Sequence, residues 1–141
     1  METVFAYGAS GTRYTFYTAY CSQPWGEAPL VYMFARRFFV LAKWEIPYVG
    51  QTGNAKKRPM PPNHERWLEA SQVYGATYIL FHVASPDEAE RRREERDLIL
   101  ALDPPMNDEY RLSALRFLQG QESRGALGAL ALGLGGQRRS P

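Results

Sequence analysis

The sequence predicts a small α+β domain in which helices flank an antiparallel or mixed β-sheet. In the first half, segments rich in β-branched and aromatic residues alternate with turns marked by glycine and proline. The second half contains segments with clear helix start and stop signals. The 141 residues, 45% of them hydrophobic, are sufficient for one core, which typically serves about 100–150 residues.

Four segments are predicted to be strands: residues 13–20, 30–34, 46–50 and 76–84. The second is apolar throughout, so we expect it to be covered on both faces. The third contains Pro47, which cannot donate a ladder hydrogen bond and therefore belongs at a strand start or on an edge strand. The second and third strands are expected to pair as a hairpin across residues 35–45.

Three helices are predicted. The first should begin at Asn63 as its N-cap and end at Gly75. The second has the strongest start signal, with Ser85 as N-cap, and should run to about Leu102. The third is expected to be capped by Asn107 or the next residue and to continue to residue 118.

The expected organisation is an N-terminal strand extension (1–22) packed on a main domain (23–119), followed by a flexible tail (120–141) rich in glycine, alanine and leucine. The alternative for the tail is a segment that docks on a partner. Cys21 is the only cysteine, which excludes an intramolecular disulfide and fits a reducing compartment. Neither a signal peptide nor a bilayer-spanning stretch is expected, so we predict a soluble, cytoplasmic protein without a membrane partner.

Basic residues are concentrated in the middle of the chain. Between residues 36 and 58, Glu45 is the only acidic residue among six basic ones: Arg36, Arg37, Lys43, Lys56, Lys57 and Arg58. Such a cluster favours a phosphate-backbone partner, whereas the alternative is an ordinary solvated surface.

Glu95 lies at an unusual place in the predicted helical pattern. It shares one helix face with Leu98 and Ile99, which are three and four positions later. A carboxylate on an apolar face is costly unless it meets a cation or a metal. The alternative is that Glu95 sits at the edge of this face and pairs with Arg91 or Arg92.

Several fragments, in order, resemble the signature of the GIY-YIG nuclease family. The first two fragments are Leu30-Val31-Tyr32 and the run from Pro47 through Tyr48 to Asn54. The others are Arg58, ten positions after Tyr48, and Glu95 followed by Leu98-Ile99, Pro104 and Asn107. The resemblance covers residues 28–108. Leu30 stands where the family usually has glycine, Gln51 where some repair-type relatives have lysine, and Pro62 where many have histidine or tyrosine.

The resemblance implies a DNA endonuclease whose catalytic residues are Tyr32, Tyr48, Arg58, Glu95 and Asn107. His64 is a candidate to replace the residue lost at Pro62, the alternative being a surface residue in a first helical turn. Glu95 would hold one Mg²⁺ or Mn²⁺, Arg58 would bind the scissile phosphate, and one tyrosine would act as general base. DNA-backbone contacts are expected from Arg36, Arg37, Lys56 and Lys57. Cleavage specificity would be weak, or supplied by a partner or by self-association.

Two other functions remain open from the sequence. The first is a nucleic-acid-binding module that keeps this fold without catalysis, which the departures at Leu30 and Pro62 favour. The second ignores the resemblance and takes the chain as an aromatic sheet that stacks single-stranded nucleic acid on Tyr14, Phe16 and Tyr20.

Overall fold

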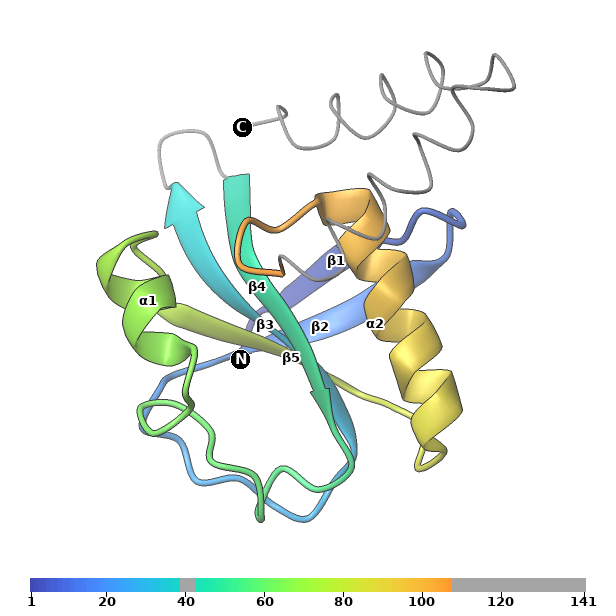
Figure 1. Cartoon of the computed structure of the whole chain (residues 1–141), viewed down its shortest axis with the longest axis horizontal. Coiled ribbons are helices and arrows are strands. Elements are labelled where there is room, and N and C mark those ends of the chain that lie inside the picture. Colours follow the sequence, from blue (N-terminus) through green and yellow to red (C-terminus); the bar gives the residue numbers. More distant parts are fainter. Residues whose placement is uncertain (39–42, 108–141) are drawn as a thin grey trace.

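The computed structural model describes residues 1–38 and 43–107, and Figure 1 shows their arrangement. Five antiparallel strands form one sheet in the order β1-β2-β5-β3-β4. The strands are β1 (Thr3–Tyr7), β2 (Arg13–Ala19), β3 (Leu30–Phe38), β4 (Lys43–Thr52) and β5 (Tyr78–Val83). The α+β class is therefore confirmed, with an antiparallel sheet, and β1 is an additional strand that was not predicted.

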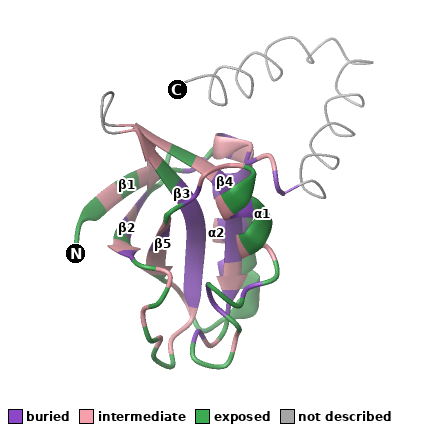
Figure 2. Cartoon of the chain, turned by 90° about the vertical axis from the view of Figure 1, so that its left-hand side faces the viewer, coloured by how far each residue is buried: buried purple, intermediate pink, exposed green. Residues whose placement is uncertain are grey.

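The two described helices, α1 (Trp67–Gln72) and α2 (Glu88–Leu102), lie on opposite sides of the sheet (Figure 1). Strand residues therefore alternate between two cores. Tyr32 and Phe34 of β3 belong to the core on the α1 side, whereas Val31 and Met33 pack with Leu98 and Ile99 of α2. Strand β3 is buried from Leu30 to Ala35, as the apolar sequence of this segment predicts, and Figure 2 shows it at the centre of the molecule.

The predicted start of the first helix was wrong. Asn63 lies in a turn in which its backbone N–H donates to the carbonyl of Met60, and the N-cap of α1 is Arg66. His64 accounts for the difference: its Nδ1 accepts from the backbone N–H of Arg66 and its carbonyl accepts from that of Trp67, so residues 64–67 form a turn before the helix begins. The predicted stop at Gly75 is confirmed, since this glycine adopts φ of +74° just before β5.

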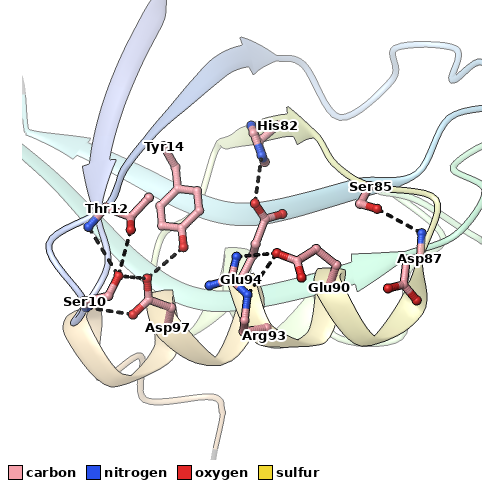
Figure 3. A network of polar contacts seen from close by, with 10 residues as sticks. All are labelled: Ser10, Thr12, Tyr14, His82, Ser85, Asp87, Glu90, Arg93, Glu94 and Asp97. Carbon is pink, nitrogen blue, oxygen red and sulfur yellow. Dashed lines mark hydrogen bonds and ion pairs between the residues drawn. The ribbon is translucent and has the colours of Figure 1, made fainter.

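The N-cap predicted for α2 was also wrong, by two residues. Asp87 is the N-cap and accepts a hydrogen bond from the backbone N–H of Ala89, while the Ser85 hydroxyl accepts from the backbone N–H of Asp87 (Figure 3). The charged cap fits the positive end of the helix dipole better than a serine hydroxyl. The helix ends at Leu102, as predicted. The third predicted helix lies outside the described residues, as does the predicted tail.

Asp97 of α2 holds the turn between β1 and β2. Its carboxylate accepts hydrogen bonds from the backbone N–H of Ser10 (2.8 Å), the Ser10 hydroxyl (2.7 Å) and the Tyr14 hydroxyl (2.7 Å), as Figure 3 shows. Burial, together with Asp97, raises the pKa of Tyr14 to about 12, so Tyr14 remains a donor at neutral pH. A Cβ atom on Gly8 would lie only 1.9 Å from Asp97 Oδ2, which explains why this turn contains a glycine.

Among the described residues, no helix is long and apolar enough to cross a membrane.

Candidate active site

Tyr32 is at the centre of the candidate site. Its ring lies across Gly50, the residue opposite it on β4, and a Cβ atom at position 50 would come within 2.7 Å of the tyrosine hydroxyl and Cζ. The Tyr32 side chain is completely buried. The pairing of β3 with β4 therefore fixes this ring against a position that only glycine can occupy without displacing it.

The Tyr32 hydroxyl lies 2.7 Å from His64 Nε2 and accepts a hydrogen bond from Arg58 Nε at 3.2 Å. His64 Nδ1 accepts from the backbone N–H of Arg66 at 3.0 Å, so the proton of a neutral His64 ring is on Nε2. This tautomer donates to Tyr32. The phenol oxygen therefore receives two hydrogen bonds, from an imidazole and from a guanidinium.

Both Tyr32 and His64 are uncharged at neutral pH. Burial lowers the pKa of His64 to about 4, and the cations Arg58 and Arg66 contribute to this shift. Burial also raises the pKa of Tyr32, and the hydrogen bond from Arg58 only partly opposes this. His64 is buried, with 3% exposure, so its alternative assignment as a surface residue was wrong. Tyr32 and His64 thus form a neutral pair that orients Arg58.

A tight turn after β4 delivers Arg58 to Tyr32. The Asn54 side-chain oxygen accepts from the backbone N–H groups of Lys56 and Lys57, and the Asn54 carbonyl accepts from the backbone N–H of Arg58. At the other side of the guanidinium, Arg58 Nη2 donates to Glu65 at 2.8 Å. One edge of the Arg58 fork is therefore occupied by Tyr32 and another by a solvent-exposed carboxylate.

Tyr48 and Glu95 complete the group. The Tyr48 ring stacks on Phe34 (centroids 5.2 Å apart) and lies 6.4 Å from the Tyr32 ring. Burial raises the pKa of Tyr48, and the negative charge of Glu95 raises it further, which places the carboxylate within electrostatic reach of this phenol. Glu95 is buried on α2, at 7% exposure. The structure thus brings Tyr32, Tyr48, Arg58 and His64 together, and the charge of Glu95 on α2 acts on Tyr48.

The arginines one turn before Glu95 contact β4 and the first turns of α2. Arg91 donates to the side chain of Gln51 at 2.9 Å and to two backbone carbonyls at the start of α2. Arg92 binds Glu88 through an i,i+4 ion pair. Gln51 thus serves to fix Arg91 between β4 and α2.

Asn107 does not point at the tyrosines. Its side-chain oxygen accepts from the backbone N–H of Val49 (3.0 Å), and its side-chain nitrogen donates to the Val49 carbonyl (2.9 Å). The buried amide therefore pairs with edge strand β4 as a neighbouring strand would. Its effect on the site is to hold the strand that carries Tyr48, so it is a positioning residue.

The four predicted DNA-contacting residues separate into two pairs. Lys56 and Lys57 are exposed beside Arg58, whereas Arg36 and Arg37 lie at the far end of β3. The Arg36 guanidinium lies 4.4 Å from the centroid of the Phe38 ring, and Arg37 forms an ion pair with Glu2. Only the lysine pair is adjacent to the candidate site.

A pocket of about 410 Å³ opens next to Arg58. It is lined by residues 21–25 and 55–63, and includes Trp25, Lys56, Lys57 and Arg58. These segments contain no acidic residue. The pocket therefore presents three positive charges and an aromatic ring, a combination that suits a phosphate ester with an attached base.

Within the parts of the chain that the structure describes, no cluster of three or more His, Cys, Asp or Glu side chains could hold a metal ion. A Mg²⁺ site needs fewer protein ligands, because this ion keeps several waters and is commonly bound through one or two carboxylates. Glu95 is a buried carboxylate whose negative charge raises the pKa of Tyr48. The donor set thus fits an ion held by one carboxylate, with water and a substrate phosphate.

Several residues of the site escaped the sequence analysis. Glu65 and Arg66 contact Arg58 and His64, but charged residues in a short helical turn give no sequence signal of such a role. The importance of Gly50 follows only from the β3–β4 register. Trp25 lies in a loop, and no sequence pattern predicts that its side chain lines the pocket next to Arg58.

No protein-family model, curated protein or solved structure matches this chain.

Proposed function

We propose that this chain is a metal-dependent endonuclease that hydrolyses phosphodiester bonds in DNA through a GIY-YIG-type site. The observation that carries the proposal is the contact between Arg58, His64 and Tyr32, with the Tyr48 ring beside them and within the electrostatic influence of Glu95. Hydrolysis needs a cation on the phosphate, an acceptor for a water proton and a metal ligand. These residues, which resemble the family signature in order and spacing, supply one of each.

The two tyrosines take different roles in this proposal. Tyr32 is fully buried and orients Arg58, whereas Tyr48 is only half-buried and is influenced by the charge of Glu95. We therefore assign the contact with the attacking water, and the acceptance of its proton, to Tyr48. Mg²⁺ or Mn²⁺ at Glu95 would supply positive charge to the phosphate and favour the phenolate.

Arg58 binds the scissile phosphate in this scheme. Its planar fork presents donors on two edges, and one edge is fixed by Tyr32. The partner on the other edge, Glu65, is exposed, so a phosphate can displace it at a small cost in free energy. Lys56 and Lys57 then meet the adjacent phosphates from the rim of the pocket.

The test is nicking of supercoiled plasmid in Mg²⁺ or Mn²⁺. We expect the wild type to nick the plasmid, and Glu95→Gln to lose at least two orders of magnitude in rate. Glu69→Gln, an exposed glutamate on α1, is the matched control and should retain full activity. Equal nicking by wild type and Glu95→Gln would refute the proposed site.

A second function, a nucleic-acid-binding module without catalysis, is favoured by one observation. Burial, together with the charge of Glu95, raises the pKa of Tyr48, so this phenol stays protonated at neutral pH and cannot accept a proton unless a bound cation offsets the shift. Salt-sensitive binding of DNA by a well-folded protein that never nicks it, with either metal, would establish this alternative.

A further inference from the structure

The α1 side of the sheet carries aromatic side chains well beyond the candidate site. In the strand register, Tyr17 of β2 is opposite Phe81 of β5, and Phe81 is opposite Tyr32 of β3. Directly opposite residues point to the same face of a sheet. The ring centroids of Tyr17 and Phe81 are 5.9 Å apart. An aromatic line therefore runs across three neighbouring strands and ends at the buried tyrosine of the site.

Strand β1 extends this line to the edge of the sheet. Phe5 is opposite Thr15, which is two residues from Tyr17, so Phe5 and Tyr7 share the face of Tyr17. The three side chains are exposed by 52% (Phe5), 58% (Tyr7) and 39% (Tyr17). We call Phe5, Tyr7 and Tyr17 the aromatic row.

Neither described helix covers the aromatic row. The α1 helix packs further along the sheet, where Trp67 meets the Phe34 ring at 5.1 Å, and α2 packs on the opposite face. Figure 2 shows β1, β2 and β5 side by side on the left, with α1 on the right, on the β4 side of the sheet. Exposed aromatic side chains that cluster in this way commonly mark a binding surface.

The charge on this face is positive. The Arg13 guanidinium lies 4.6 Å from the centroid of the Phe5 ring. On strands β1, β2 and β5, the residues that share this face include no aspartate or glutamate: Thr3, Phe5, Tyr7, Arg13, Thr15, Tyr17, Ala19, Ile79, Phe81 and Val83. Rings with an adjacent cation and no anion suit a chain of bases joined by phosphates.

The aromatic row is also connected to the basic pocket. Phe81 packs edge-on against Trp25, with centroids 5.4 Å apart, and Trp25 lines the pocket that contains Arg58. A strand of nucleic acid that lies on the row is thereby led towards the pocket. Bases in a duplex are stacked on each other and cannot lie on these rings, so the occupant must be unpaired.

We propose that the aromatic row binds single-stranded DNA and directs it to the candidate site, so that the preferred substrate has an unpaired segment next to the cleaved bond. The choice of DNA and the link to cleavage rest on the proposed function. The surface itself differs from the one that the sequence suggested. Tyr14 and Phe16 are buried under α2, and Tyr20 contacts Tyr78 on that same side of the sheet.

The experiment measures the fluorescence anisotropy of a labelled 20-nucleotide DNA strand, in Glu95→Gln protein so that no cleavage intervenes. We expect tighter binding of this strand than of the 20-base-pair duplex of the same sequence. Tyr7→Thr and Tyr17→Thr should each weaken strand binding by about fivefold to a hundredfold, the range for loss of one base–aromatic stack. Threonine keeps the β-propensity of each position.

Tyr20→Thr is the matched control, because Tyr20 is 73% exposed but lies on the other face. It should leave binding unchanged, and Tyr17→Phe, which retains the ring, should bind within about twofold of the parent protein. Equal losses for Tyr20→Thr and Tyr17→Thr would overturn the proposal. So would tighter binding of duplex, tighter binding of the RNA strand of this sequence, or a dimer that Tyr7→Thr converts to a monomer.

The two proposals can fail separately. If the wild type binds the strand through Tyr7 and Tyr17 but never nicks plasmid, the endonuclease assignment is wrong and the aromatic row stands. If the wild type nicks plasmid, and threonine at both positions alters neither binding nor the rate on a substrate with an unpaired segment, the aromatic row is refuted alone.

Discussion

Gly50→Ala should destabilise the protein although alanine ordinarily suits a strand better than glycine. The new methyl group would lie 2.7 Å from Cζ and the hydroxyl of Tyr32 and 2.9 Å from its Cε2, below any normal contact. The Tyr32 ring is buried and rests on a strand that is itself buried on both faces. It cannot move without disturbing Phe34 and His64, which pack against it.

The expected cost has two parts. Overpacking of a core costs about 1–3 kcal/mol. Displacing the Tyr32 hydroxyl from His64 and Arg58 leaves buried polar atoms without partners, at a further cost of about 1–3 kcal/mol. The strand preference for alanine returns about 0.5–1 kcal/mol. Gly50→Ala should therefore lower the free energy of unfolding by about 1–5 kcal/mol, a large part of the stability of an ordinary domain.

Urea unfolding followed by tryptophan fluorescence measures this change. Gly26→Ala is the matched control, since a Cβ atom there meets nothing within 4 Å, and it should change stability by less than about 0.5 kcal/mol. In a Tyr32→Val background the ring is absent, so Gly50→Ala should cost little there. A double-mutant cycle should accordingly give a coupling energy above about 1 kcal/mol. Equal effects of Gly50→Ala in both backgrounds would show that the ring does not lie against Gly50.

Three further predictions concern the polar groups that hold the fold. Burial alone would raise the pKa of Asp97, but the hydrogen bonds from Ser10 and Tyr14 outweigh it and lower this pKa. The ionised carboxylate therefore stabilises the folded state above pH about 4, and this contribution is lost as the pH falls below that value. Asp97→Asn should flatten the acid limb of a curve of unfolding free energy against pH, and an unchanged limb would contradict the assignment. Burial lowers the pKa of His64 to about 4, so the folded state disfavours protonation of this ring. The free energy of unfolding should therefore decline as the pH falls from about 6.5 towards 4. Thermal unfolding of the His64→Gln variant should lack that decline. Asn107→Leu leaves the backbone N–H and carbonyl of Val49 without their side-chain partners and should lower the free energy of unfolding in urea by about 2–4 kcal/mol. Amide exchange at Val49 should become faster, and unchanged exchange would argue against these two hydrogen bonds.

Local patterns predicted the parts of the fold that depend on nearby residues. Apolar residues 30–34 indicated a doubly covered strand, and glycine at position 75 indicated a helix stop; both are confirmed. Helix starts were harder to predict, because Ser85 and Asp87 are both good capping residues. Which of them caps α2 depends on the direction in which the chain leaves β5. Strand β1 was missed because it is defined by its pairing with β2 in a hairpin, and its own sequence shows no periodic pattern that would indicate a strand.

The candidate site divides in the same way. Tyr32, Tyr48, Arg58 and Glu95 were selected from a sequence pattern. The structure brings the first three together, and the charge of Glu95 acts on Tyr48. His64 was weighed against a surface alternative, because a histidine before a short helix carries no sign of its burial. Arg36 and Arg37 looked like part of the same basic face, but they lie at the end of β3 that pairs with the start of β4, whereas Lys56 and Lys57 follow the end of β4. Charge counting along a sequence does not register this separation.

The amide of Asn107 has a consequence for the solubility of the folded protein. Strand β4 ends the sheet, and an uncovered end strand is a template on which a second molecule can add its own strand. Here the middle of β4 is occupied from within the chain, by Asn107 at Val49 and by the backbone N–H of Met106 at the Pro47 carbonyl. Proline at position 47 removes one more donor from this side. The same short segment that steadies Tyr48 therefore also blocks intermolecular strand addition at the β4 edge of the sheet.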